Sequence, residues 1–144
     1  MASANDTQVG GSHYQSDWQH WDFVDNPLWH LGWQESCAIK YISRWRKKNG
    51  LQDLQKAIHY TDKLIEIVKA GWRQPYGRVP MPAVIRYCDA NDLSGVEREA
   101  VTVLSRWSEL WTLQAVRAGI LALIAEVEEI QQQLEIAQSM KADG

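Results

Sequence analysis

The sequence has little cysteine, and this excludes two kinds of small protein. Cys37 and Cys88 are the only two cysteines in 144 residues. Two cysteines cannot form the disulfide framework of a small secreted domain, and they are too few for a four-cysteine zinc cluster. His13, His20 and His30 lack the four-residue helical spacing of paired zinc ligands, so no metal site is expected. A reducing cytoplasm is the predicted location.

The sequence also has no long hydrophobic run. Its longest uninterrupted apolar stretch, Ala118 to Ala125, has eight residues, whereas a transmembrane helix needs roughly 20. The N-terminal region is polar and has neither a basic start nor an apolar core, so we expect no secretory signal. The sequence therefore predicts a chain that does not span a membrane.

The common catalytic motifs are absent as well. The sequence contains no G-x-x-x-x-G-K-[ST] phosphate loop, no G-x-G-x-x-G, no H-E-x-x-H and no G-x-S-x-G. Any phosphoryl chemistry would therefore need a different kind of site. The net charge of −3 gives no reason to expect a general attraction to nucleic acid.

Two unusual features remain, and both are concentrated in the first half of the chain. Between residues 40 and 48 the sequence carries five basic residues and no acid, and the whole chain contains eight tryptophans against one phenylalanine. Clustered cations can attract an anion locally even when the net charge is negative. Tryptophan offers a flat ring with a polar edge.

Apolar residues recur at three- and four-residue intervals along most of the chain, and no segment alternates as a strand would. We therefore predict an all-α protein. The short Asn49-Gly50 connection makes the first two long helices an antiparallel αα-hairpin. Ser94 and Glu97 have the spacing of a capping box. The predicted helices cover residues 35–48, 51–70, 83–90, 94–107 and up to 30 residues from Glu109.

The same pattern divides the chain into four parts. We expect a flexible tail over 1–12, a loop and basic hairpin over 13–70, a Pro/Gly connector over 71–82 and a helical part over 83–144. The helical part would pack into the same domain or into an oligomer. A final helix of roughly 45 Å is long for so small a domain, so a homo-oligomer is expected.

A stripe of cations on the predicted helix 35–48 is a candidate phosphate site. Lys40, Arg44 and Lys47 follow one another at i, i+4 and i+7, and Lys48 lies beside them. An arginine can bind two phosphate oxygens at once, and lysines act as mobile point charges. Lys56, near the start of the next helix, could complete the ring. The alternative is the solvated basic face of an amphipathic helix.

Aromatic residues upstream could supply the flat partner that a nucleotide base needs. The base-stacking candidates are Trp18, Trp21 and Trp33, in a loop that begins with His13 and Tyr14. The alternative for the tryptophans is plain core filling.

The segments GGSHYQ (10–15) and AIKYISRWRKKNGLQDLQKAIHYTDKLIE (38–66) resemble a small bacteriophage family of unknown function. The family pattern is an early His-Tyr followed by K-Y-x-x-R, K-N and D-L-x-K-A. One branch includes the nucleotide kinase of T-odd coliphages, which phosphorylates deoxynucleoside monophosphates without a conventional phosphate loop. The matching positions are His13, Tyr14, Lys40, Tyr41, Arg44, Lys48, Asn49, Asp53, Leu54, Lys56, Ala57 and Tyr60.

The resemblance implies a cytoplasmic phage protein that binds a nucleotide, with ATP and Mg²⁺ as cofactors if it is a kinase. Arg44, Lys40 and Lys48 would hold phosphate oxygens, and Lys56 would neutralise a second phosphate. Asp53 would orient a lysine or ligate Mg²⁺, so Asp53 and Lys40 are the catalytic candidates.

Two other functions use the same residues. The first is a sponge that sequesters a nucleotide immune signal of the host without turnover. The second is a structural or DNA-binding helical protein, for which binding would fall steeply with salt.

Overall fold

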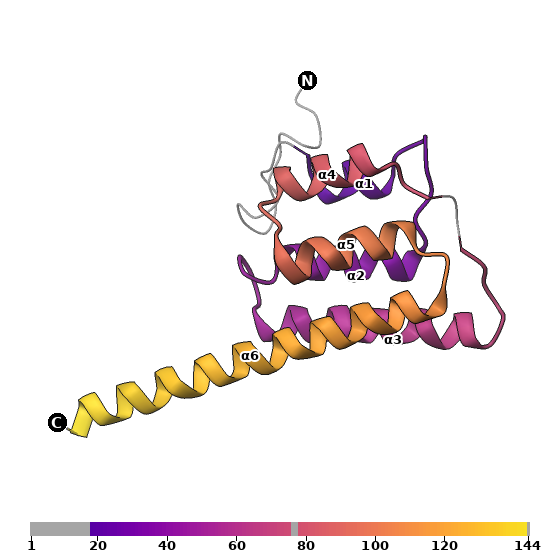
Figure 1. The fold of residues 1–144 in the computed structure, drawn as a ribbon. Coiled ribbons are helices and arrows are strands. Elements are labelled where there is room, and N and C mark those ends of the chain that lie inside the picture. The colour runs from indigo at the N-terminus through magenta and orange to yellow at the C-terminus, as the bar shows by residue number, and fades with distance from the viewer. Residues whose placement is uncertain (1–17, 76–77, 144) are drawn as a thin grey trace.

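The computed structural model describes residues 18–75 and 78–143, and in these ranges the chain forms six helices and no strand (Figure 1). The predicted all-α class is therefore confirmed. The helices are α1 (His20–Val24), α2 (Trp33–Arg44), α3 (Leu51–Lys69), α4 (Met81–Ala90), α5 (Gly95–Arg106) and α6 (Leu110–Asp143). The predicted tail, together with His13 and Tyr14, lies outside the described residues.

The six helices form two layers of three. In Figure 1, α4 lies over α1, α5 over α2 and α6 over α3, and the same three pairs are in contact. Within the layers, α2 contacts α3, and α5 contacts both α4 and α6. The connector after α3 thus brings the C-terminal helices back onto the N-terminal ones instead of holding two separate halves apart.

The α2–α3 hairpin forms as the Asn49-Gly50 signal predicts. Gly50 has a φ of +56°, a conformation that glycine adopts without strain, and its N–H donates to the Trp45 carbonyl at 2.9 Å. The predicted end of the first helix at residue 48 is wrong, because α2 ends at Arg44 and residues 45–50 form turns. The stripe of cations therefore does not continue along one helix to Lys48.

The core lies between the two layers. From the first layer, Ile39, Ile42 and Leu64 are completely buried. Their apolar spacing puts them on the inner faces of α2 and α3, which explains why these segments are helices in this protein. The second layer contributes a matching set of buried residues: Val84, Val101, Leu104, Leu113 and Ile120.

The start of α5 was predicted correctly, but the capping contact on which the prediction rested does not form. Ser94 is the N-cap of α5, but its side chain makes no capping hydrogen bond. Glu97 is buried, and its Oε1 accepts hydrogen bonds from the Trp45 indole at 3.0 Å and from Arg46 Nε at 2.9 Å. The carboxylate therefore joins α5 to the turn after α2, and this tertiary contact replaces the local capping box.

We expect Glu97→Ala to lower the free energy of unfolding by about 1–3 kcal/mol, because it leaves the Trp45 N–H buried without an acceptor. Urea denaturation measures the change. Glu99→Ala is the matched control, since Glu99 is exposed on the same helix, and its effect should stay within about 0.5 kcal/mol. Equal effects of the two substitutions would contradict the contact.

Helix α6 is 34 residues long and extends well past the rest of the molecule (Figure 1). Its buried residues are Leu113, Val116, Ile120 and Leu123, all in the half that contacts α3 and α5. By length and apolar composition, α6 is the one helix among the described residues that could cross a membrane. The core helix of a soluble protein passes the same test, so this is weak evidence, and the absence of a membrane span stays a prediction.

Candidate functional site

An ion pair joins the end of α2 to the start of α3. Arg44 Nε and Nη2 lie 3.2 Å from the two carboxylate oxygens of Asp53, and the Asn49 N–H donates to Asp53 Oδ2 at 3.2 Å. The Asp53 side chain is completely buried, and the Arg44 side chain is 10% exposed. The carboxylate is therefore the counter-ion that fixes the Arg44 guanidinium in place.

Three cations surround the ring of Tyr41. Arg44 Cζ lies 4.7 Å from the ring centroid, Lys56 Nζ 5.2 Å and Lys40 Nζ 5.5 Å. All three distances are within the range of cation–π attraction. Lys40, Tyr41, Arg44 and Lys56, with Tyr60, which stacks on Tyr41, are called the cationic cluster below.

The two lysines of the cluster differ from Arg44 in their surroundings. Among the described residues, no carboxylate lies within 4.0 Å of Nζ of Lys40 or Lys56, although both side chains are partly buried. The Tyr41 ring orients the cations but carries no formal charge to cancel theirs. Within residues 18–75 and 78–143, Asp53 is the carboxylate that pairs with the cluster, and it pairs with Arg44, so these described groups together carry a net positive charge. Such an arrangement favours an anion that accepts several charge-assisted hydrogen bonds.

Tyrosine hydroxyls add neutral donors to the cluster. The rings of Tyr41 and Tyr60 are stacked with centroids 5.8 Å apart and an interplanar angle of 10°. The neighbouring Cys37 raises the pKa of Tyr60, and partial desolvation raises it further. Tyr60 therefore stays protonated at neutral pH; its hydroxyl also hydrogen-bonds with Cys37, so it would donate to an anion by exchanging that partner.

His20, the first residue of α1, is near enough to Lys40 for the two charges to interact, and it adds no positive charge to the cationic cluster. Its Nε2 lies 2.8 Å from the Ser36 carbonyl oxygen, and burial lowers the pKa of His20 to about 4. Lys40 and Arg44 lower this pKa as well. The ring is therefore neutral at pH 7, and with Nε2–H donating to Ser36 its Nδ1 is an acceptor.

We expect the free energy of unfolding to rise between about pH 4 and pH 6.5, because in this range the unfolded chain binds a proton at His20 that the folded chain excludes. The contribution is complete above pH 6.5 and is lost as the pH falls toward 4, with a total of up to about 3 kcal/mol. His20→Gln should flatten this part of the profile measured by urea denaturation at a series of pH values. His59→Gln, at an exposed position of α3, should not.

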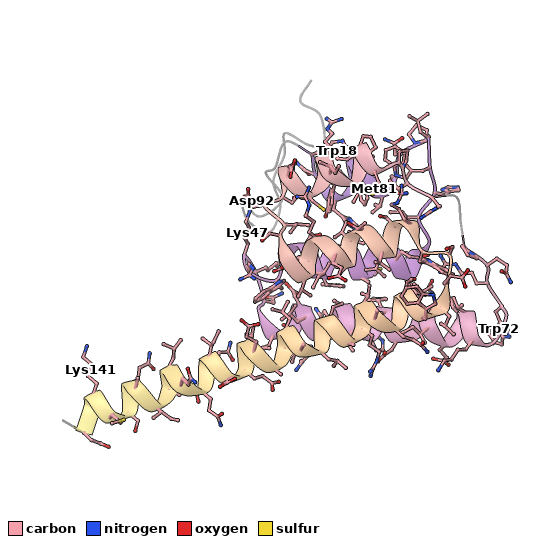
Figure 2. The ribbon with its side chains drawn as sticks, in the orientation of Figure 1. Trp18, Lys47, Trp72, Met81, Asp92 and Lys141 are labelled. Atoms are coloured by element: carbon pink, nitrogen blue, oxygen red, sulfur yellow. The ribbon has the colours of Figure 1, made fainter. Side chains whose placement is uncertain are left out.

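The remaining predicted phosphate ligands lie on the turn after α2. Lys47, Lys48 and Asn49 are exposed, and Lys47 Nζ lies 3.7 Å from Asp92 Oδ2 (Figure 2). Lys47 is therefore directed toward the α4–α5 connection. Lys40, Arg44 and Lys56 come together, whereas Lys47 does not share their contact with Tyr41.

The three base-stacking candidates lie in different environments. Trp18 is 8% exposed and packs against Phe23, Trp29 and Tyr87, as the core-filling alternative predicts. Trp21 is 45% exposed and Trp33 is 70% exposed. Trp33 begins α2 and Arg44 ends it, so about 16 Å of helix separates the two residues.

Several polar contacts could not be read from the sequence. Glu35 is buried, accepts a hydrogen bond from the Trp107 indole at 3.0 Å and forms an ion pair with Arg73. Its partners are 72 and 38 positions away, and no local pattern connects them. Within the described residues, no three His, Cys, Asp or Glu side chains are grouped to hold a metal ion.

The fold and the cationic cluster thus define a small helical protein with a basic, tyrosine-lined surface on its α2–α3 hairpin. Residues 9–62 match the sequence family described as protein of unknown function DUF3310. The match includes all five residues of the cationic cluster and ends within α3, so α4–α6 lie outside it. No curated protein and no solved structure matches the chain.

Proposed function

We propose that this protein binds a nucleotide through its phosphate groups at the cationic cluster. The observation that carries the proposal is the convergence of Lys40, Arg44 and Lys56 on one tyrosine ring, with no carboxylate within 4.0 Å of either lysine Nζ among the described residues. Folding Lys40 and Lys56 close to Arg44, with no carboxylate beside either lysine in the described part of the chain, costs electrostatic energy, and a bound phosphate would return it.

Each member of the cluster has a different part in this proposal. Lys40 and Lys56 bind phosphate oxygens as mobile ammonium groups. Arg44 is held by Asp53, which fixes its guanidinium charge beside the two lysines. The Tyr60 hydroxyl donates one further hydrogen bond. From its resemblance to a phage family, we propose that the protein acts in the cytoplasm of an infected cell.

Phosphoryl transfer is the reaction that the resemblance implies for this site, with ATP and Mg²⁺ as cofactors. The chemistry consists mainly of positioning the phosphates and stabilising their charge, which Lys40, Lys56 and Arg44 could supply. Such a kinase would convert a deoxynucleoside monophosphate to its diphosphate.

Sequestration without turnover is the second candidate function, and the state of Asp53 favours it. This acid is the one carboxylate that contacts the cluster among the described residues, and it is buried against Arg44 and the Asn49 N–H. A carboxylate so occupied is poorly placed to act as a general base or to bind Mg²⁺. A protein of this kind would trap a nucleotide immune signal of the host and so block an antiphage defence.

The binding proposal is tested by calorimetric titration of the full chain with deoxynucleoside monophosphates and with the corresponding nucleosides. We expect binding of the monophosphates only. Equal affinity for nucleosides, or binding only to duplex DNA with a steep dependence on salt, would overturn the phosphate site.

The two candidate functions are separated by a second experiment. Mass spectrometry identifies small molecules released from the purified protein, and a parallel incubation supplies a deoxynucleoside monophosphate with ATP and Mg²⁺. New diphosphate establishes a kinase. A cyclic or unusual nucleotide that is released intact, with no turnover, establishes sequestration.

A further inference from the structure

The C-terminal half of α6 has an apolar side that, past the partly buried Val127, no described residue covers. The last buried residue of the helix is Leu123. Beyond it, Ile130 is 49% exposed and Leu134 is 57% exposed. In Figure 2 this part of α6, which ends near the labelled Lys141, stands clear of the other helices. Residues 126–143 are called the arm below.

The apolar side of the arm continues the side that packs on the protein's own core. Val116, Ile120 and Leu123 face α3 and α5. The same three- and four-residue steps lead on to Val127, Ile130, Leu134 and Ala137. A helix with this repeat keeps these residues on one side over several turns, which is the pattern of a two-stranded coiled coil. The arm therefore has a seam suited to a second helix.

We propose that the arm of a second copy of this chain covers this seam in the antiparallel direction. The fold itself selects the direction. A second α6 laid parallel along the seam would run into the space that α3 and α5 already fill, because the seam and the packed half of α6 lie on one side of the helix. An antiparallel arm avoids this clash, since the two globular bodies then lie at opposite ends of the paired arms.

The register follows from pairing the apolar residues. When Ile130 lies opposite the partner's Leu134, Val127 lies opposite the partner's Ala137, and each pair occurs twice around the two-fold axis. The same register brings Lys141 opposite the partner's Leu123, at the edge of the partner's body. The seam is then covered from the end of the buried half of α6 to the end of the helix.

Charge complementarity supports this direction. The arm carries acids at 126, 128, 129, 135 and 143 and one cation, Lys141, and of these Lys141 continues the seam and Glu126 directly precedes the seam residue Val127. A lysine side chain on a helix points toward the N-terminus, which in the antiparallel pair directs the Lys141 ammonium toward the partner's Glu126. Parallel arms would instead place the two Lys141 side chains against each other in the seam.

Sedimentation velocity of the full chain at several concentrations tests the association. We expect a dimer for the native chain and a dissociation constant raised at least about 100-fold for Leu134→Glu, because the substitution buries two carboxylates in the seam. The matched control is Gln132→Glu, which adds the same charge at an exposed position off the seam and should remain dimeric. The exposure of Leu134 makes unfolding by the substitution an unexpected outcome, and circular dichroism checks it.

A native chain that is monomeric at every concentration, or a Leu134→Glu variant that dimerises as well as the control, overturns the proposal. So does a monomer that instead binds to lipid vesicles, since α6 has the length and composition of a membrane helix.

Disulfide cross-linking tests the direction. In a Cys37→Ser background with the buried Cys88 retained, Val127→Cys and Ala137→Cys chains are mixed, allowed to exchange and oxidised. The antiparallel register predicts a cross-link in the mixture and none in either variant alone, because like positions are then about 15 Å apart. Efficient cross-linking of Ala137→Cys to itself indicates parallel arms and overturns the assignment.

Discussion

Replacing Lys40 and Lys56 together by glutamine should weaken the binding of a deoxynucleoside monophosphate at least about 100-fold, because each charge-assisted hydrogen bond contributes about 1.5–3 kcal/mol. The same change should leave the free energy of unfolding unchanged or raise it. The two lysines lie near Arg44 around one ring without an acidic partner in the described part of the chain, so removing their charges relieves repulsion. Calorimetry measures the affinity and urea denaturation the stability.

A loss of affinity without a loss of stability is the result expected if Lys40 and Lys56 form a binding site. A loss of both would indicate a structural role. Lys63→Gln is the matched control, because Lys63 lies on the same helix as Lys56 and its Nζ is 3.6 Å from Glu66. It should leave the affinity unchanged. A double variant that loses stability together with binding would mean that Lys40 and Lys56 support the fold, and unaltered affinity would place the ligand elsewhere.

Arg44→Met should lower the free energy of unfolding by about 3–5 kcal/mol, because it leaves the buried Asp53 carboxylate without its counter-ion. Replacing both partners, by Arg44→Met with Asp53→Leu, should restore part of this loss, since a buried ion pair is often matched in stability by apolar residues of similar volume, whereas the Asn49 N–H loses its acceptor. Urea denaturation of the single and double variants measures both changes.

A second ion pair provides the control for this prediction. Lys47→Met removes the cation that lies 3.7 Å from Asp92, and because both side chains are more than half exposed its effect should be within about 0.5 kcal/mol. A loss for Arg44→Met as small as that for Lys47→Met would show that Asp53 is hydrated in the folded chain. In that case Arg44 would not be fixed for phosphate binding by its counter-ion.

Local spacing was enough to predict the main helices. The repeat of Leu51, Leu54, Ile58 and Ile65 fixes α3, and Asn49-Gly50 fixes the turn before it. These signals succeed because helical periodicity and a glycine turn depend on residues a few positions apart. The end of α2 was wrong by four residues because the following turn is held by contacts with α5, through Glu97, and with α3, through Asp53.

The candidate site was predictable only in part. The pattern of cations identified Lys40, Arg44 and Lys56, and the family pattern added Tyr41 and Tyr60. Spacing along one helix also suggested Lys47, which the turn directs toward Asp92 instead. Tyr41 becomes the centre of the cluster only when α3 packs beside α2, because two of its contacts come from its own helix and the others from α3.

The sequence by itself determined the helical class, the hairpin and the positive segment, because each depends on the order of neighbouring residues. The tertiary structure alone decided that Asp53 is the buried partner of Arg44, that Trp18 is a core residue and that Glu97 joins α5 to α2. These roles depend on which side chains desolvate one another across the two layers, and burial between distant segments leaves no periodic signal along the chain.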